Sequence, residues 1–345
     1  MTETILTIVV PCYNEEEMLA YTMAELGRLL EDLETEGLIS SSSKLLFVDD
    51  GSRDRTWNLI HKESLKSERV TGLKLSRNSG HQNALLAGIF TSMKSSDCIV
   101  TIDADLQDDP CAIREFLVKY HEGCDIVYGV RSKREKDTFF KRATAQGFYK
   151  LMAKLGASLV YNHADFRLLS RRAAEELAHF GEANMFLRGI IPLIGFRSDQ
   201  VMYERKERMA GETKYPLKKM LSFALDGLTS FSVTPIRLVL MAGLVSSVIS
   251  ILFGTYFLFL KFTGSTEAGW TSLISSIWLI GGVQLTAIGM IGEYIGKIYK
   301  ETKRRPKFIV EIDTYTLPAS LQLKNREMEQ DEGFSIKYRQ LPETN

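Results

Sequence analysis

The sequence predicts an α/β fold: a Rossmann-like, mostly parallel sheet flanked by helices, followed by interfacial amphipathic helices and a two-helix transmembrane hairpin. Two observations carry this prediction. In the first part of the chain, apolar runs that end in polar residues alternate with segments of helical spacing. That alternation is typical of a parallel sheet covered on both faces. Towards the end of the chain, two long runs contain no charged residue.

Four apolar runs mark strands in chain order. ILTIVV, KLLFV and CIVTI each continue into an acidic or amide-rich cluster, whereas DIVYGV continues into basic residues. The segments with helical spacing are EMLAYTMAELGRLLEDLE, TWNLIHKESLKS, NALLAGIFTSMKS and CAIREFLVKYHEG. Ligands of such sheets bind beyond the carboxyl ends of the strands. The polar clusters therefore predict a binding site at that edge.

Several functional classes are excluded or disfavoured. No GxGxxG follows the first strand, and no GxxxxGK[ST] occurs anywhere, so neither a dinucleotide fingerprint nor a P-loop is present. Lys+Arg and Asp+Glu are both 43, and this balance gives no support to a nucleic-acid partner. The four cysteines have neither zinc nor disulfide-framework spacing, which favours a reducing compartment. We find no secretory signal at the N-terminus.

The stretch IVTIDADLQDDP, from Ile99 to Pro110, leads an apolar strand into a cluster of carboxylates. Asp103 and Asp105 are two residues apart, so on an extended strand end their side chains point to the same side. Magnesium commonly takes one or two carboxylates together with substrate phosphates, and Gln107 adds a neutral oxygen. The pattern indicates a divalent-cation site that holds phosphate. The alternative is a solvated acidic turn that caps the next helix.

The C-terminal third predicts attachment to a membrane. The segment YPLKKMLSFALDGLTSF has apolar residues at helical spacing and reads as an interfacial helix. The charge-free runs 238–260 and 270–292 follow it. As helices each would measure roughly 34 Å, enough for a hydrocarbon core of ~30 Å. The alternative is a pair of buried helices in a soluble core.

Basic residues flank this hairpin on its outer sides, and a short polar turn separates the two runs. Positive-inside asymmetry then places both flanks in the cytoplasm. We predict a multi-pass plasma-membrane protein with its globular domain and both termini cytoplasmic. The predicted parts are a cytosolic domain at 1–215, an interfacial helix at 216–234, a hairpin at 235–300 with spans at about 236–260 and 270–294, and a basic flank with a flexible tail at 301–345.

The motifs together carry a resemblance to a known family. VVPCYNEEE, FVDDGSRDRT, SRNSGHQNALLAG, DADLQDDP and DFRLLSRRA follow one another in order. They resemble family 2 inverting glycosyltransferases of the GT-A fold. With ERKERMAGETKY and the two-helix tail, the whole pattern is similar to the polyprenyl-phosphate glycosyltransferases, over about residues 5 to 310.

This resemblance implies roles for residues on the donor side. The nucleotide-sugar pocket would be lined by Pro11, Tyr13, Asn14, Glu15, Asp49, Asp50, Gln82, Asp103 and Ala104. The residues that would hold Mg2+ or Mn2+ on the donor diphosphate are Asp103, Asp105 and Gln107. The donor would be a nucleotide sugar, with UDP-glucose or UDP-N-acetylglucosamine favoured.

On the acceptor side, the resemblance implies a polyprenyl (undecaprenyl) phosphate, a membrane lipid, and an inverting displacement that serves cell-envelope glycosylation. The phosphate of this acceptor would be held by Arg131, Arg142, Arg208 and Lys214. Asp165 of DFRLL is the position often assigned as general base, and Asp105 and Arg131 complete the predicted catalytic set. Because a phosphate monoester is already largely a dianion at neutral pH, its second pKa being about 6, a base is not required. The alternatives are that Asp165 orients the acceptor, the metal site or Arg167, or that it is a buried aspartate paired with Arg167.

Relatives of this kind suggest a homo-oligomer, possibly a tetramer, and Gly281, Gly282 and Gly289 would let helices approach closely. Three rival functions stay open. A processive polysaccharide synthase would carry a Q-x-x-R-W element, which this chain lacks. A glycosyltransferase with another acceptor, and a catalytically silent membrane scaffold that binds sugar nucleotide, are the other two.

Overall fold

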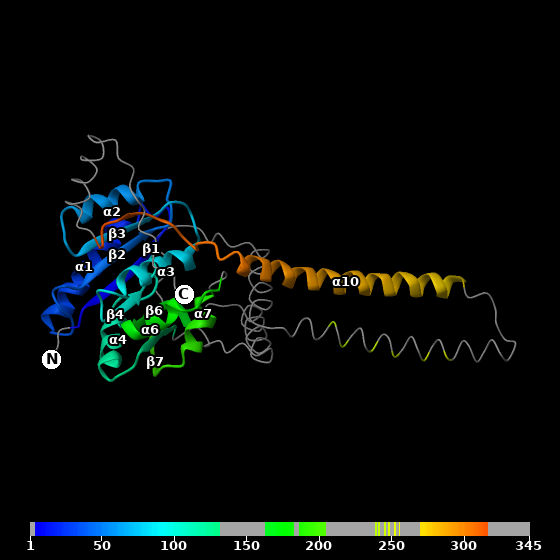
Figure 1. The fold of residues 1–345 in the computed structure, drawn as a ribbon. Coiled ribbons are helices and arrows are strands. Elements are labelled where there is room, and N and C mark those ends of the chain that lie inside the picture. Colours follow the sequence, from blue (N-terminus) through cyan, green and yellow to red (C-terminus); the bar gives the residue numbers. More distant parts are fainter. Residues whose placement is uncertain are drawn as a thin grey trace.

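The computed structural model describes residues 4–131, 163–182, 186–204 and 270–316, and six scattered helical positions between 239 and 255. The helices and strands of these parts alternate in the first half of the chain (Figure 1). In chain order they are β1 (Leu6–Cys12), α1 (Leu19–Thr35), β2 (Lys44–Asp49), α2 (Thr56–Ser64), β3 (Val70–Leu75), α3 (His81–Ser92), β4 (Cys98–Thr101), α4 (Ala112–His121), β5 (Ile126–Arg131), β6 (His163–Ser170), α6 (Arg171–Ala178), α7 (Leu187–Ile190), a 3-10 turn η1 (Ile191–Ile194), β7 (Ser198–Tyr203), α10 (Trp270–Thr302) and β8 (Val310–Asp313).

The eight described strands form one mixed sheet with the order β7-β5-β6-β4-β1-β2-β3-β8. Strands β4, β1, β2 and β3 are parallel neighbours, as the alternating pattern predicted, and β5 is parallel to β7. Strand β6 lies between β4 and β5 and runs antiparallel to both, and β8 runs antiparallel to β3. The α/β class with flanking helices is confirmed, and the sheet is more mixed than the apolar runs alone indicated.

Apolar side chains alternate between the two faces of the sheet, so that each face has its own core. Leu6, Ile8 and Val10 of β1 pack with the buried residues of α1, α2 and α4. Val9 points to the opposite face, where α3, α6 and α7 pack. At this face α3 lies very close to the strands, because a Cβ on Gly88 would come within 2.3 Å of Val9 Cγ1.

Four strands were not among the predicted apolar runs. Strand β3 has a glycine at its centre, Gly72, where a Cβ would meet Ile60 Cγ2 at 2.5 Å, so tight packing replaces the expected apolar side chain. Strands β6 and β7 lie after the first alternating units, and polar residues interrupt their patterns. Strand β8 is a four-residue edge strand, too short for a periodic signal.

The C-terminal segment corrects one predicted boundary. Residues 301–345 were expected to form a basic flank and a flexible tail, yet β8 pairs with β3 and extends the sheet. The Thr314 side chain then accepts from the N–H of Gly72 at 2.7 Å, and Lys307 Nζ donates to the Phe180 carbonyl at 3.1 Å. Residues 307–316 therefore belong to the globular domain, while 317–345 lie outside the described residues.

Helix α10 has 33 residues and extends away from the sheet (Figure 1). Within the described part of the chain, no helix combines the length and the apolar character needed to cross a bilayer. The predicted span at about 270–294 falls on α10, whereas the span at about 236–260 is described only at scattered positions. The predicted interfacial helix at 216–234 lies outside the described residues.

Candidate functional site

The loops that follow β1 and β2 brace each other at the carboxyl edge of the sheet. The N–H of Asn14 donates to Ser52 Oγ at 3.0 Å, and Asn14 Oδ1 accepts from the N–H of Arg53 at 2.9 Å. Asn14 has a left-handed φ of 55°, which asparagine adopts more readily than most residues. Tyr13 is 42% exposed beside it. This braced segment carries the predicted donor-pocket residues Tyr13, Asn14 and Glu15, and Pro11 lies just before it in β1.

The two acidic residues at the carboxyl end of β2, its last residue Asp49 and the following Asp50, differ in their partners. Asp50 is buried, and its carboxylate accepts the N–H groups of Ser79 at 2.7 Å and Gly80 at 2.9 Å, so it fixes the loop before α3. Asp49 Oδ1 accepts from the N–H of Ser52 at 3.2 Å, but the buried Oδ2 has no hydrogen-bond partner among the described residues. Burial raises the pKa of Asp49. Since an unsatisfied buried acceptor is costly, Asp49 Oδ2 is suited to receive a donor from a ligand.

The acidic stretch after β4 is a turn, which corrects the expectation of an extended strand end. Strand β4 ends at Thr101, and the N–H of Leu106 donates back to the Asp103 carbonyl at 3.2 Å. Leu106 has a left-handed φ of 45°. The N–H of Gln107 donates to Asp105 Oδ1 at 3.2 Å. Turn geometry, and not strand alternation, therefore brings Asp103, Asp105 and Gln107 together.

Ala104, between the two aspartates, is buried, and its carbonyl accepts from Thr22 Oγ1 of α1 at 2.6 Å. This bond ties the acidic turn to a helix that is itself packed on the sheet. The backbone of the turn is thus fixed by the core, while Asp103 keeps 38% of its side chain exposed.

Asp165 stands at the centre of a cluster of cationic and amide groups. Because β6 runs antiparallel to β4, with Arg167 opposite Thr101, Asp165 lies beside the acidic turn. Arg167 Nη2 lies 2.5 Å from Asp165 Oδ1, and Arg188 of α7 donates through Nε at 3.2 Å and Nη2 at 3.0 Å. Gln82 Nε2 donates to Asp165 Oδ2 at 3.3 Å. The carboxylate is held on both oxygens.

His81, the first residue of α3, links this cluster to the acidic turn. Its Nε2 lies 3.5 Å from Asp103 Oδ1 and 3.6 Å from Asp165 Oδ2. Burial would lower the pKa of His81, but the hydrogen bond to Asp165 and the charge of Asp103 outweigh it and raise the pKa. The structure thus joins α3, β6 and the turn after β4 through one imidazole.

The pKa values of the two acids of this site are shifted in opposite directions. Burial alone would raise the pKa of Asp165, but the hydrogen bond from His81 and the charges of Arg167 and Arg188 outweigh it and hold the pKa well below its usual range. For Asp103, desolvation, reinforced by neighbouring carboxylates such as Asp165, raises the pKa to about 6. Asp165 is therefore a stable anion and a poor proton acceptor, whereas Asp103 feels repulsion from neighbouring carboxylates that the charge of His81 offsets only in part.

Arg131 lies at the carboxyl end of β5, as predicted, and it is already held by the protein. Its Nη2 lies 3.2 Å from Asp108 Oδ1, and its Nε lies 3.4 Å from the Tyr203 hydroxyl, which donates to the same Asp108 oxygen at 2.7 Å. The Arg131 side chain is 27% exposed. This pairing orients a half-buried guanidinium at the same edge of the sheet as the acidic turn.

Three predicted phosphate-binding residues lie outside the described ranges, and two residues of the observed site were not predicted. Arg142, Arg208 and Lys214, expected to hold the acceptor phosphate, lie outside the described residues. Sequence reasoning singled out neither His81 nor Arg188. His81 directly precedes Gln82, and that adjacency was the available signal. Arg188 lies in the short α7, and no local pattern in FLRGII distinguishes it from a surface arginine.

The oxygen ligands of the acidic turn fit a hard divalent cation. Among the described residues, no three histidine, cysteine or acidic side chains form a complete metal-binding group. Asp103, Asp105 and Gln107 nevertheless belong to one short turn, and magnesium and manganese take carboxylate and amide oxygens together with phosphate oxygens. A cation there would offset the carboxylate repulsion that acts on Asp103. The ligands that fit are Asp103, Asp105 and Gln107.

Comparison with known proteins places these motifs in a family context. Residues 7–178 match the family model for glycosyl transferase family 2. The uncharacterized glycosyltransferase YkoT of Bacillus subtilis is 57% identical over 336 residues, covering 97% of this chain and 98% of that protein. The bactoprenol glucosyl transferase of Shigella phage SfV is 39% identical over 311 residues, covering 89% of this chain and 98% of that protein. The prophage bactoprenol glucosyl transferase homolog of Escherichia coli is 37% identical over 308 residues, with coverages of 89% and 98%.

Proposed function

The chain belongs to glycosyl transferase family 2 and is a glycosyltransferase, and we propose that it transfers a sugar from a nucleotide sugar to a polyprenyl phosphate. The phage and Escherichia coli relatives are named as bactoprenol glucosyl transferases, which supports a polyprenyl-phosphate acceptor. Glucose, or N-acetylglucosamine, carried on UDP is the donor sugar that we propose. The single observation that carries the proposal is the acidic turn of Asp103 and Asp105, joined through His81 to Asp165 at the carboxyl edge.

On the donor side, the loops after β1 and β2 would hold the nucleotide. Asp49 Oδ2, a buried acceptor with no partner among the described residues, would accept a hydrogen bond from the base or ribose. Tyr13 is exposed next to it and offers a ring for stacking. Asp103, Asp105 and Gln107 would hold Mg2+ or Mn2+ on the donor diphosphate. When bound, such an ion would neutralise charge that develops on the leaving diphosphate.

The reaction is a single displacement at the anomeric carbon. An oxygen of the acceptor phosphate forms a bond to that carbon, and the bond to the diphosphate oxygen breaks, so the nucleoside diphosphate leaves with the electron pair from the opposite face. An α-linked donor then gives a β-linked lipid product. The acceptor phosphate is largely dianionic at neutral pH, its second pKa being about 6, so no side chain has to remove a proton from it.

Asp165 then acts as an orienting carboxylate. Two guanidinium groups and His81 surround it, and these partners hold its pKa well below the usual range. We propose that Asp165 fixes Arg188 and His81 in place beside the acidic turn. Arg131, with Arg142, Arg208 and Lys214 of the undescribed segments, would receive the acceptor phosphate, since guanidinium groups bind phosphate through paired hydrogen bonds.

A membrane-embedded hairpin formed by 235–300 would keep the acceptor chain in the bilayer while its phosphate reaches the site. The exposed isoleucines along α10, such as Ile277, Ile288 and Ile295, support contact with lipid or with other apolar helices. We propose a plasma-membrane protein with a cytoplasmic catalytic domain, assembled as a homo-oligomer.

Cys111 is exposed on that domain, whereas Cys12, Cys98 and Cys124 are buried. A membrane-impermeant maleimide should therefore label Cys111 in inverted vesicles and not in intact cells, and the reverse labelling would contradict this topology.

The test of function uses purified full-length protein in detergent, undecaprenyl phosphate, Mg2+ or Mn2+, and a panel of labelled sugar nucleotides. We expect label from one donor in the organic phase, and none after addition of a chelator. If a donor is consumed but its label passes only to a soluble acceptor, the lipid-phosphate proposal fails and the alternative acceptor stands. If folded protein consumes no donor, the silent scaffold stands instead.

A further inference from the structure

Tyr203 is a buried tyrosine at the carboxyl edge of the sheet to which the proposed transfer reaction assigns no role. It is the last residue of β7 and the register partner of Arg131, which ends the parallel neighbour β5. The Tyr203 hydroxyl donates to Asp108 Oδ1 at 2.7 Å and lies 3.4 Å from Arg131 Nε. Asp108 directly follows Gln107 in the chain. The Tyr203–Asp108 pair therefore joins β7 and β5 to the acidic turn.

Tight packing fixes the ring of Tyr203. The residue is 5% exposed, and its ring packs edge-to-face on Phe166, with the ring centres 5.3 Å apart. A Cβ on Gly129 of β5 would come within 3.0 Å of Tyr203 Cε1, so this strand passes directly against the ring. Burial and the charge of Asp108 raise the pKa of Tyr203, so its hydroxyl stays protonated and remains a donor. A rigidly placed hydroxyl thus lies beside the guanidinium of Arg131.

The Tyr203–Asp108 pair engages one edge of the Arg131 guanidinium. Nη2 lies 3.2 Å from Asp108 Oδ1, and Nε, which shares the side edge of the planar group with Nη2, lies beside the Tyr203 hydroxyl. Among the described residues, Arg131 Nη1 has no hydrogen-bond partner. The Arg131 side chain is 27% exposed, whereas the Asp108 side chain is 3% exposed. The end of the guanidinium is therefore open for the paired hydrogen bonds that this group makes with phosphate.

We infer that Tyr203 and Asp108 are positioning residues that hold Arg131 in the orientation in which it receives the acceptor phosphate. The inference rests on the proposed function, because it takes the acceptor to be a polyprenyl phosphate. Since Asp108 follows Gln107, the same contacts set the guanidinium at a fixed place relative to the turn that would hold the donor diphosphate. Tyr203 also directly precedes ERKERMAGETKY, the segment that carries further residues expected to bind the acceptor phosphate.

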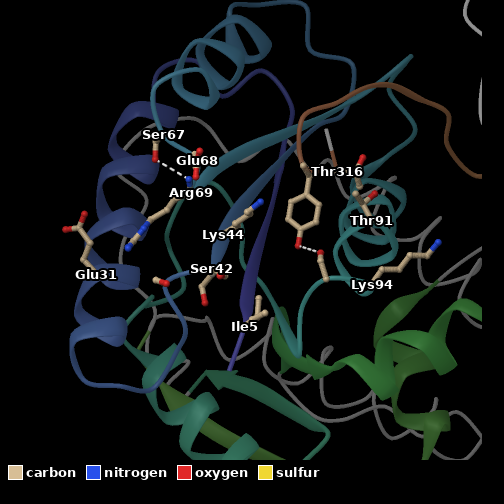
Figure 2. Close-up of a pocket in the computed structure, with 14 residues that line it drawn as sticks. Ile5, Glu31, Ser42, Lys44, Ser67, Glu68, Arg69, Thr91, Lys94 and Thr316 are labelled. Atoms are coloured by element: carbon tan, nitrogen blue, oxygen red, sulfur yellow. Dashed lines mark hydrogen bonds between the residues drawn. The ribbon is translucent and has the colours of Figure 1, made fainter. Parts of the chain in front are cut away.

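A second buried tyrosine, Tyr315, provides a matched control at the opposite, amino-terminal edge of the sheet. Figure 2 shows the hollow at that edge, which Tyr315 lines. Tyr315 is 8% exposed, and its hydroxyl lies 2.9 Å from Thr7 Oγ1 and 2.8 Å from Ser95 Oγ. Tyr315→Phe therefore removes a buried, hydrogen-bonded hydroxyl, as Tyr203→Phe does, without touching the carboxyl edge.

The experiment titrates farnesyl phosphate, a short polyprenyl phosphate, into the full-length protein in detergent and follows the heat of binding. UDP with Mn2+ is titrated separately. Tyr203→Phe removes the hydroxyl and keeps the ring that packs on Phe166. We expect this variant to bind farnesyl phosphate about fivefold more weakly, within the range of couplings between contacting residues, and to bind UDP within about twofold of wild type. Tyr315→Phe should keep both affinities within about twofold of wild type.

A double-mutant cycle separates positioning from a purely structural role. Arg131→Lys keeps the charge but removes the planar group whose side edge the pair engages. In the Arg131→Lys background, Tyr203→Phe should therefore change the affinity for farnesyl phosphate by less than about twofold. Unchanged affinity of the Tyr203→Phe single variant would overturn the inference. An equal loss in both backgrounds would overturn it too, because the hydroxyl would then act independently of Arg131.

Turnover distinguishes a failure of this inference from a failure of the proposed function. If wild type transfers no sugar to undecaprenyl phosphate and Tyr203→Phe still weakens farnesyl phosphate binding, the transfer reaction fails and the positioning role stands. If transfer proceeds with the same KM for undecaprenyl phosphate in wild type and Tyr203→Phe, the proposed function stands and the positioning role fails. Absence of farnesyl phosphate binding by wild type at about 1 mM would also overturn the positioning role.

Discussion

Replacement of Arg167 by Met tests whether the buried charge pair holds the centre of the site together. Arg167 is 1% exposed and Asp165 is 7% exposed, and their side chains lie 2.5 Å apart. Removing one partner of a buried pair commonly costs about 3–5 kcal/mol, because the other charge stays desolvated. Arg188 and His81 still contact Asp165, so we expect about 3 kcal/mol, the low end of that range.

The assay is thermal unfolding of the full-length protein in detergent at one scan rate. A loss of about 3 kcal/mol lowers the midpoint by about 6–12 °C for a domain of this size. The matched control is Arg28→Met, which breaks an exposed pair with Glu25 and should stay within about 0.5 kcal/mol of wild type. Asp165→Asn in the Arg167→Met background should recover part of the loss, since no buried charge then remains without its partner. An unchanged midpoint for Arg167→Met would refute the reasoning.

Four further outcomes are expected. Gly88→Ala should lower stability by about 1–3 kcal/mol in thermal unfolding, because its Cβ would lie 2.3 Å from Val9 Cγ1 and overpack the α3 interface; an unchanged midpoint would contradict this. Asp49→Asn should weaken UDP binding by at least about tenfold in calorimetry without lowering the midpoint, whereas wild-type affinity would remove Asp49 from the donor pocket. Tyr315→Phe should cost about 1–2 kcal/mol in the same unfolding assay while turnover at saturating substrates persists. A chelator should abolish sugar transfer, with recovery on adding Mn2+ or Mg2+; full activity in the chelator would exclude the metal site.

The alternating first half of the chain could be predicted because each strand is buried on both faces. Such strands are continuous apolar runs, and ILTIVV and KLLFV became β1 and β2 within a residue or two. Strand β8 could not be predicted in this way. Its pairing with β3 depends on a chain reversal after α10 and on contacts such as that of Thr314 with Gly72, which are distant in the sequence.

The candidate site, like the fold, could be predicted from the sequence only where local patterns determine it. The acidic residues after β2 and β4 could be located, because polar clusters at the carboxyl ends of parallel strands meet at one edge. The conformation of Asp103 and Asp105 could not, since the turn depends on a left-handed Leu106 and on the contact of Ala104 with α1. Arg188 could not be found either, because its role arises only when α7 packs beside β6.

The most direct test of the central claim compares two acceptors that differ only in the phosphate. Full-length protein in lipid nanodiscs receives a labelled sugar nucleotide and a divalent metal, with either undecaprenyl phosphate or undecaprenol. We predict labelled lipid with undecaprenyl phosphate alone, with a β-linked product from an α-linked donor. Equal labelling of both lipids, or donor hydrolysis without any labelled lipid, would contradict a glycosyltransferase whose acceptor is a polyprenyl phosphate.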